Sequence, residues 1–360
     1  MGEVDRCVSR YASLQAPTVA SLITTLRFTF HSSNQYFCTI ISRIRYLATK
    51  KTRSLAALLS AASMRLLQAV KQANDETDFS LVEFIDDIPP YAILSHTWGA
   101  DHEEVTFKDI YKGQGKGRKK PGYQKLKFCT QWATKDRIEY FWVPMIRPLF
   151  FFFTSFTNCS YQIDTCCIDK SSSAELTEAI NSMYKWYKNS TVCYVYLSDV
   201  PRRTWNIEGD GVPVASLLGS RWFTRGWTFQ ELLAPRELIF FAANGETLGR
   251  LEDFADSIAV HCKIPLELFK TYPRWFGRYS VEERLKWTAH RQTKREEDAA
   301  YCLLGCFDVQ MPLIYGEGRM KALARLRAEH DRSRNEKYRR FILDEIPEGL
   351  RDVTRSVVCL

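Results

Sequence analysis

Short, mostly apolar runs alternate with helical patterns along this chain, and this alternation restricts its fold more than any other feature. The runs are rich in β-branched and aromatic residues, which is typical of strands buried on both faces. They comprise residues 91–95 (YAILS), 138–143 (IEYFWV), 191–197 (TVCYVYL) and 237–242 (ELIFFA). Helical patterns over 123–135 and 174–188 lie between them. This order predicts an α/β fold, with a parallel sheet and helices on both faces.

The segment 220–235 (SRWFTRGWTFQELLAP) concentrates aromatic, basic and acidic residues in one predicted helix, which Ser220 caps. Trp227 and Glu231 are four residues apart and therefore lie on one face of that helix, where Arg225 can reach the same turn. A carboxylate beside an indole and a guanidinium can act as an acid or base, or can recognise a ligand by stacking and charge. The simpler alternative is a surface glutamate paired with a nearby arginine.

The net charge of +8 does not predict a nucleic-acid-binding surface, because most of it lies near the N-terminus. Residues 1–63 hold eight Lys/Arg and two acidic residues, so they contribute +6 and the rest of the chain only +2. No membrane span is predicted, because the apolar stretch within 144–163 is too short and is interrupted by Arg147 and two prolines.

The 11 cysteines and six histidines form no recognisable metal-binding pattern. Neither a CxxC pair nor an HExxH sequence is present. The vicinal pair Cys166 and Cys167, and the pair Cys302 and Cys306 one helical turn apart, are predicted to be buried thiols in a reducing compartment. We therefore expect no metal and no cofactor, and a cytoplasmic location.

Residues 1–63 differ in composition from the rest of the chain. No acidic residue occurs between Arg6 and Asn74, while Arg, Ser and Thr are frequent, as in organellar transit peptides. The alternative, which we favour, is that Met64 is the true start, because a globular pattern begins there. Either way, residues 1–63 are predicted to be a non-globular extension, and only a genuine transit peptide would direct the protein to mitochondria.

Residues 144–163 (PMIRPLFFFFTSFTNCSYQI) interrupt what otherwise reads as one strand, from 138–143 into DTCCI at 164–168. A proline-bearing insert inside a central strand would break its hydrogen-bonding ladder. Because phenylalanine runs are encoded by pyrimidine-rich tracts, we interpret the segment as a retained intron. Sequencing the transcript across codons 143–164 tests this hypothesis, and a mature message that keeps the segment would refute it.

The sequence PPYAILSHTWG, which ends at Gly99, predicts a buried strand followed by a polar loop, the place where an α/β sheet binds its ligand. Trp98 is predicted either to stack on a ligand or to anchor the core, and Gly99 would let the backbone approach a ligand closely. Asp169 follows the neighbouring predicted strand, as a structural cap or as a site residue. Ser95 and His96 are adjacent in a strand and point to opposite faces, which argues against a Ser/His/Asp triad.

Residues 251–330 predict a helical extension packed on the sheet. Its helices are expected over 282–290, 296–307 and 318–329. The acidic residues at 296–298 are predicted to form a solvated helix start, where they would complement the helix dipole. Residues 331–360 are charged and lose this periodicity, so they are predicted to be a tail.

Four motifs follow one another in an order that resembles the fungal heterokaryon-incompatibility (HET) domain. They are PPYAILSHTWG, WVDTCCIDK once 144–163 is removed, SRWFTRGWTFQELLAP and RQTKREEDAAYCLLGCFDVQMPLIYGEG. The resemblance covers Tyr91 to Arg327 and implies a domain over 64–330 that acts in non-self recognition and programmed cell death when unlike fungal cells fuse. The family pattern is contiguous where this chain has 144–163, in agreement with the intron hypothesis.

The HET domain is in turn similar to the TIR domain, a flavodoxin-like α/β signalling module. Several TIR domains cleave NAD+ at the nicotinamide–ribose bond, so the resemblance implies NAD+ as a substrate. The sequence RGWTFQEL resembles the TIR stretch around the catalytic glutamate, and that position matches Glu231. A carboxylate there would stabilise an oxocarbenium-like state or activate water.

The resemblance and the residue types together predict one catalytic residue, Glu231, and a set of ligand-binding residues. The latter are Trp98, Gly99, Asp169, Arg225 and Trp227. Arg225 would contact a phosphate, and one of the tryptophans would stack on a ring of the ligand. Two function classes follow: an NAD+-cleaving enzyme switched on by self-association, or a non-catalytic self-associating scaffold that recruits a death effector. In both, we expect the sensor or incompatibility partner to lie in another chain or in sequence lost from this one.

Overall fold

The computed structural model describes residues 64–71, 77–85, 87–100, 102–106, 109–110, 116–143, 167, 173–201 and 214–345. The chain divides between Ala61 and Ala62 into two compact units, and every described residue belongs to the second unit. The predicted extension 1–63, the predicted insert 144–163 and the predicted site residue Asp169 lie outside the described residues.

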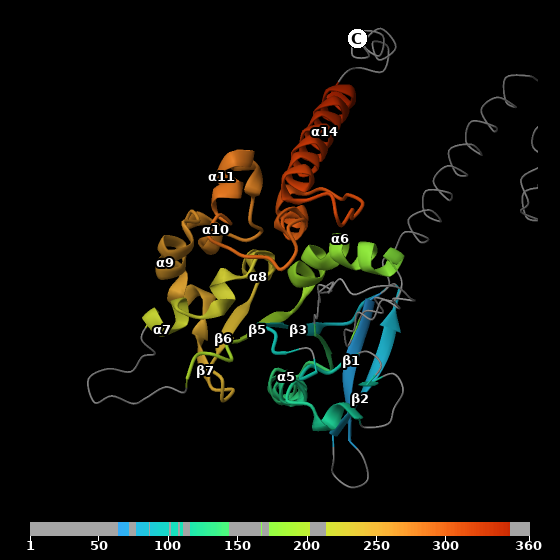
Figure 1. Ribbon diagram of the computed structural model, residues 1–360, viewed down its shortest axis with the longest axis vertical. Coiled ribbons are helices and arrows are strands. Elements are labelled where there is room, and N and C mark those ends of the chain that lie inside the picture. The colour runs from blue at the N-terminus through green and yellow to red at the C-terminus, as the bar shows by residue number, and fades with distance from the viewer. Residues whose placement is uncertain are drawn as a thin grey trace, which may run out of the picture. The chain divides into compact units, whose positions relative to one another are not determined.

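Within the described unit, the strands form one seven-stranded sheet in the order β2-β1-β4-β3-β5-β6-β7 (Figure 1). The strands are β1 (Met64–Lys71), β2 (Thr77–Phe84), β3 (Tyr91–His96), β4 (Tyr140–Trp142), β5 (Val192–Tyr196), β6 (Leu238–Phe241) and β7 (Thr247–Arg250). The central strands β4, β3, β5 and β6 pair in parallel, whereas β1, β2 and β7 pair antiparallel at the edges. The α/β fold is confirmed, and the three antiparallel strands were not predicted.

Helices cover both faces of the parallel strands, as predicted. The helix α5 (Tyr123–Lys135) packs on one face, where the ring of Phe128 lies 4.9 Å from that of Phe241. The opposite face carries α6 (Ser173–Asn189) and the short α8 (Thr228–Leu233) (Figure 1). All six residues of β3 are buried between these layers, which explains its continuous apolar sequence.

The segment predicted as one helix from Ser220 is two helices, η2 (Arg221–Thr224) and α8. The Ser220 hydroxyl caps the first of them by accepting from the Trp222 amide. Arg225 is extended, and the amide of Gly226 donates to the Gln292 carbonyl at 2.8 Å. The single-helix prediction is wrong because the backbone here forms hydrogen bonds with a distant segment.

A glycine is required at that break. A Cβ on Gly226 would lie 2.3 Å from Cγ2 of Thr293, well inside contact distance. The Gln292 amide donates in return to the Thr224 carbonyl at 2.6 Å, so the two segments hold each other as a short parallel bridge. The absence of a side chain at 226 is what permits this close approach.

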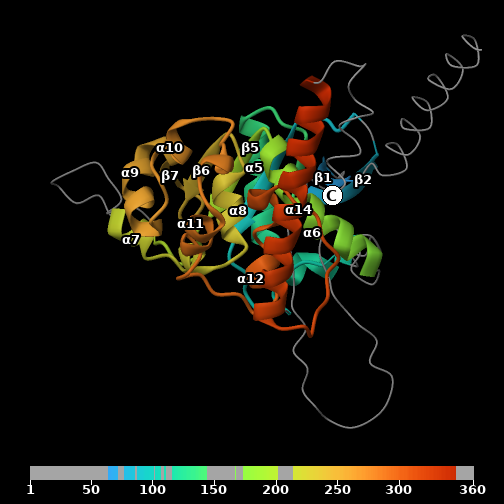
Figure 2. The same ribbon diagram turned by 90° about the horizontal axis from the view of Figure 1, so that it is seen from above.

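The C-terminal part of the described unit is helical, as predicted, with more and shorter helices than expected. Its elements are α9 (Leu251–Cys262), α10 (Glu267–Lys270), η3 (Phe276–Arg278), α11 (Val281–Lys286), α12 (Asp298–Tyr301), α13 (Leu304–Phe307) and α14 (Arg319–Glu345). The short α7 (Val214–Leu218) lies earlier in the chain, between β5 and η2. The helix α13 contacts α6. The helix α12 contacts α14 (Figure 2). This extension therefore lies against the face of the sheet that carries α6 and α8.

The predicted tail boundary at residue 331 falls inside α14, which continues to Glu345. The periodicity is lost there because residues 331–338 are mostly exposed and need no apolar stripe. Arg332 instead forms ion pairs with Glu329 and Glu336, one turn away on either side. Such pairs stabilise exposed helices by a few tenths of a kcal/mol each, roughly 0.2–0.5.

Candidate functional site

The Glu231 carboxyl lies in the interior, between α8 and the carboxyl end of β3. Glu231 is only 6% exposed. The Ser95 hydroxyl donates to Oε2 of Glu231 at 2.5 Å, and Ser95 Oγ accepts from the indole nitrogen of Trp222 at 2.7 Å. The Tyr187 hydroxyl, from α6, lies nearby and donates to the Leu94 carbonyl at 3.1 Å. The simpler sequence interpretation, a surface glutamate, is wrong because α8 packs inward.

Burial raises the pKa of Glu231 to about 7. The hydroxyls of Ser95 and Tyr187 and the positive charges of Arg291 and Arg225 act in the opposite direction and lower it. A carboxyl group with a pKa near neutrality can both donate and accept a proton at the pH of a cell.

Arg225 lies in the stretch that precedes α8, the helix that carries this carboxyl. Arg225 is half-buried, and its backbone is extended. Burial lowers the pKa of Arg225, and the charges of Glu231 and Asp298 raise it, which places both acids within electrostatic reach. The guanidinium remains charged at any physiological pH.

Trp227 is the residue before α8 and is half-buried against the core. Its indole nitrogen donates to Oδ2 of Asp298 at 3.2 Å, so the ring is tied to the helical extension. Asp298 also accepts from the Tyr315 hydroxyl at 3.1 Å. Trp227 and Glu231 therefore belong to two different hydrogen-bonding groups, and stacking of Trp227 on a ligand stays a prediction.

The acidic residues Glu297 and Asp298 are buried, contrary to the prediction of a solvated helix start. They do begin α12, but Oε1 of Glu297 accepts the amides of Gly316 and Gly318 at 2.7 and 3.0 Å. Burial raises the pKa of Asp298 to about 6. The helix-dipole pattern misled the prediction because both acids have partners far along the chain.

Trp98 and Gly99 lie in the loop that follows β3. Trp98 is half-buried and packs against the core. The Gly99 amide donates to Oε1 of Glu104 at 2.9 Å, and a Cβ at this position would lie 2.6 Å from Oε2 of Glu103. The close approach that the glycine permits is to its own loop, and the ligand roles of both residues stay predictions.

Ser95 and His96 point to opposite faces of β3, as predicted from their adjacency. Ser95 faces α8, while His96 is buried and subject to the charge of Lys125 on α5. Burial and that charge hold the pKa of His96 well below its usual range. Neither ring nitrogen of His96 has a hydrogen-bond partner among the described residues. This arrangement agrees with the argument against a triad.

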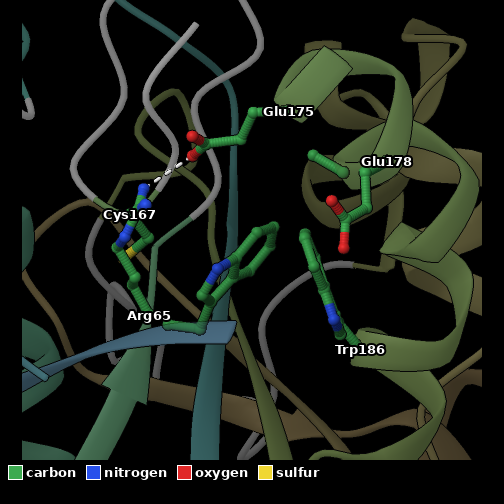
Figure 3. A pocket seen from close by; sticks show the side chains of 7 residues that line it. Arg65, Cys167, Glu175, Glu178 and Trp186 are labelled. Carbon is green, nitrogen blue, oxygen red and sulfur yellow. Dashed lines mark hydrogen bonds and ion pairs between the residues drawn. The ribbon is translucent and has the colours of Figure 1, made fainter. Parts of the chain in front are cut away.

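A small cavity lies between β1, the end of β4 and α6 (Figure 3). Its lining consists of Arg65, Trp142, Cys167, Glu175, Glu178, Ala179 and Trp186. Arg65 and Glu175 form an ion pair of 2.6 Å at its edge. The volume of about 20 Å³ is enough for one water molecule, so this cavity does not accommodate a nucleotide.

The described residues contain no group of three or more His, Cys, Asp or Glu side chains that could hold a metal ion. The cysteines at 129, 167, 193, 262, 302 and 306 are free and buried, which confirms the prediction for Cys167, Cys302 and Cys306. Across the same part of the chain, no helix has the length and apolar character needed to cross a membrane.

Sequence reasoning missed three residues that surround Glu231. Ser95 was considered only for a triad, although a polar residue in a fully buried strand usually has a buried partner. Trp222 was assigned no role in the site, and its indole nitrogen donates to Ser95. Arg291 belongs to a segment sixty residues further on, and no spacing rule connects it with α8.

Over 240 residues, which are 67% of this chain, the sequence is 45% identical to "Vegetative incompatibility protein HET-E-1" of Podospora anserina. The chain is a relative of a fungal vegetative incompatibility protein. The predicted resemblance to heterokaryon-incompatibility proteins is thereby confirmed. The matched region spans 16% of the length of that relative. No family model matches the chain, and no solved structure matches it.

Proposed function

We propose that the described unit is a heterokaryon-incompatibility domain that acts in fungal non-self recognition and programmed cell death. We further propose that it cleaves NAD+ at the nicotinamide–ribose bond, with Glu231 as the catalytic carboxylate. The 45% identity to a vegetative incompatibility protein carries the first part. The buried Glu231, with a pKa of about 7 and two arginines nearby, carries the second. A cytoplasmic location fits the buried free thiols of the described residues.

The strand order supports a ligand site near Glu231. In chain order, the four parallel strands β3, β4, β5 and β6 lie in the sequence 2-1-3-4, which is how flavodoxin-like sheets begin. In such sheets ligands bind beyond the carboxyl ends of the strands, where the order reverses. Here that point lies between β3 and β5. Ser95, next to the last residue of β3, is the residue that donates to Glu231.

The chemistry requires only groups that this chain supplies. Loss of nicotinamide leaves positive charge on the ribose, which an ionised Glu231 would stabilise before water completes the reaction. The cationic Arg225 would bind a phosphate of the same dinucleotide. No metal or further cofactor enters the proposal, because nicotinamide leaves as a neutral molecule.

A second candidate is the non-catalytic scaffold, in which self-association recruits a death effector. One observation favours it. Glu231 is 6% exposed and already hydrogen-bonded by Ser95, so its carboxyl also has a sufficient structural role in the folded core. In that case the surface of the unit would determine its partners, and Glu231 would only stabilise the fold.

The deciding experiment incubates the full chain at high concentration with NAD+ and follows nicotinamide release. We expect release by the unaltered protein and at least a 100-fold loss in Glu231→Gln, the usual effect of removing a carboxylate that acts directly in the reaction. Glu282→Gln, on the exposed side of α11, is the matched control and should leave release unchanged. No release from a folded, self-associating chain, together with toxicity that survives Glu231→Gln, would establish the scaffold instead.

A further inference from the structure

Arg291 joins the helical extension to the beginning of α8. It is 5% exposed. Its Nη1 donates to the Arg225 carbonyl at 2.9 Å and to Oγ1 of Thr228 at 2.8 Å. Thr228 is the first residue of α8 and lies three residues before Glu231. One guanidinium thus bonds both Arg225, in the extended stretch before α8, and Thr228, the first residue of α8. These two residues define where the helix starts.

The charge of Arg291 has no carboxylate bonded to it within the described residues. Its Nη2 lies 3.8 Å from the sulfur of Cys262, and the ring of Phe229 lies 5.5 Å from its guanidinium carbon. Its Nε has no hydrogen-bond partner in the same part of the chain. A buried cation is costly unless opposite charge lies close by. Burial lowers the pKa of Arg291, and the groups that act against it are Cys262, Cys302 and, with the smallest effect, the carboxylate of Glu231.

We propose that Arg291 is a positioning residue for Glu231: its guanidinium fixes the start of α8, three residues before the carboxylate, and adds a buried positive charge there. The proposal deepens the proposed function and takes from it only that Glu231 is the reacting group. The position and ionisation of Glu231 can be measured without any substrate.

Other groups also face Glu231, and they define what the loss of Arg291 would change. They are Ser95 of β3, Tyr187 of α6, Cys193 of β5 and Arg225 before α8. Ser95, Tyr187 and Arg225 favour the ionised carboxylate, while burial opposes it more strongly. Cys193 is a buried thiol whose pKa is raised by burial and by Glu231, so it stays neutral. Without Arg291, the balance would shift further towards the protonated acid.

The test follows the titration of Glu231 as the infrared difference between the full chain and its Glu231→Gln variant. In Arg291→Gln we expect the midpoint to move upward by about one pH unit or more, because a nearby positive charge is lost. In Arg291→Lys the charge remains but the planar guanidinium that carries both hydrogen bonds is lost, so the midpoint should move less. In both variants the amides of the first turn of α8 should exchange faster with solvent, and nicotinamide release should fall about 10-fold in kcat with a smaller change in KM.

Arg284 offers a matched control, because it is 4% exposed and also bonds a backbone carbonyl, that of Cys306. Arg284→Gln should lower stability without moving the Glu231 titration. If Arg291→Gln does not fold, Arg291→Lys decides. A titration and an exchange pattern that are unchanged in a folded Arg291→Lys would overturn the proposal. If the unaltered chain releases no nicotinamide, the proposed NAD+ cleavage is refuted. The titration of Glu231 and the amide exchange of α8 still decide the role of Arg291.

Discussion

Ser95 and His96 are consecutive residues of β3, both are buried, and their surroundings have opposite character. On one face, Ser95 accepts from Trp222 and donates to Glu231. On the other face, both nitrogens of His96 lack a hydrogen-bond partner among the described residues. The same strand therefore separates a bonded polar group from an isolated one.

The two faces also respond to pH with opposite sign. Burial raises the pKa of Glu231 to about 7 and lowers that of His96, so each group prefers its neutral form. An acid of this kind destabilises the fold as the pH rises, whereas a base of this kind destabilises it as the pH falls. The contribution of a buried titratable residue to the free energy of unfolding thus depends on the pH at which unfolding is measured.

The largest effect should come from the indole on the Ser95 face. Trp222→Ala removes a fully buried ring and the donor to Ser95, so we expect a loss of about 3–5 kcal/mol in the free energy of unfolding. Trp132→Ala, on the α5 face, removes a half-buried ring that lies 4.7 Å from that of Phe241 and should cost less. Urea unfolding measures both. An equal or larger loss for Trp132 would contradict the comparison.

Glu231→Gln should alter how stability depends on pH. Because the folded pKa of about 7 exceeds the ordinary value of 4.5, the contribution of Glu231 is fully present below pH 4.5 and is lost as the pH rises through 7. Over that range the unaltered chain should lose about 3 kcal/mol relative to the variant, which cannot ionise. Unfolding midpoints at several pH values test this, with Glu282→Gln as the control. Parallel curves for the variant and the unaltered chain would refute it.

His96→Leu should have the smallest effect and the opposite sign. Removing two unsatisfied nitrogens should be neutral or stabilising by about 1 kcal/mol at pH 7. Below pH 6.5 the gain should grow, because His96 then takes up a proton in the unfolded chain while the buried ring, whose pKa is lowered, stays neutral in the folded one. Ser95→Ala, one residue earlier, should instead cost about 1–3 kcal/mol, since it leaves Trp222 unpaired. A destabilised His96→Leu would show that the imidazole has a partner that the described residues do not include.

The parallel core could be predicted from the sequence because its signal is local. Continuous apolar runs correspond to β3, β4, β5 and β6, and the helix over 123–135 has the same bounds as α5. The antiparallel edge strands escaped prediction since β1, β2 and β7 are defined by their pairing partners rather than by an apolar run of their own. The break at Gly226 escaped for the same reason, because its cause is Gln292.

The same difference between local and distant signals applies to the candidate site. Glu231 and Arg225 lie within one segment, so spacing could bring them together. Ser95 and Arg291 lie 136 and 60 residues away in sequence, and only the fold places them beside Glu231. The fate of Glu297 and Asp298 shows the limit of a local rule, since both sit at a helix start and yet are buried.

The paired backbone at Thr224, Gly226 and Gln292 has a consequence for modularity. Thr224 and Gly226 precede β6 and β7, and Gln292 follows them. Their amide and carbonyl groups pair with each other, so removing one segment leaves backbone groups of the other without a hydrogen-bond partner. The sheet and the helical extension are therefore one indivisible module. A fragment cut between β7 and residue 291 would lose the bond that ends η2 and starts α8. The smallest fragment that keeps these backbone hydrogen bonds must therefore include Gln292, well beyond β7, where the sheet ends.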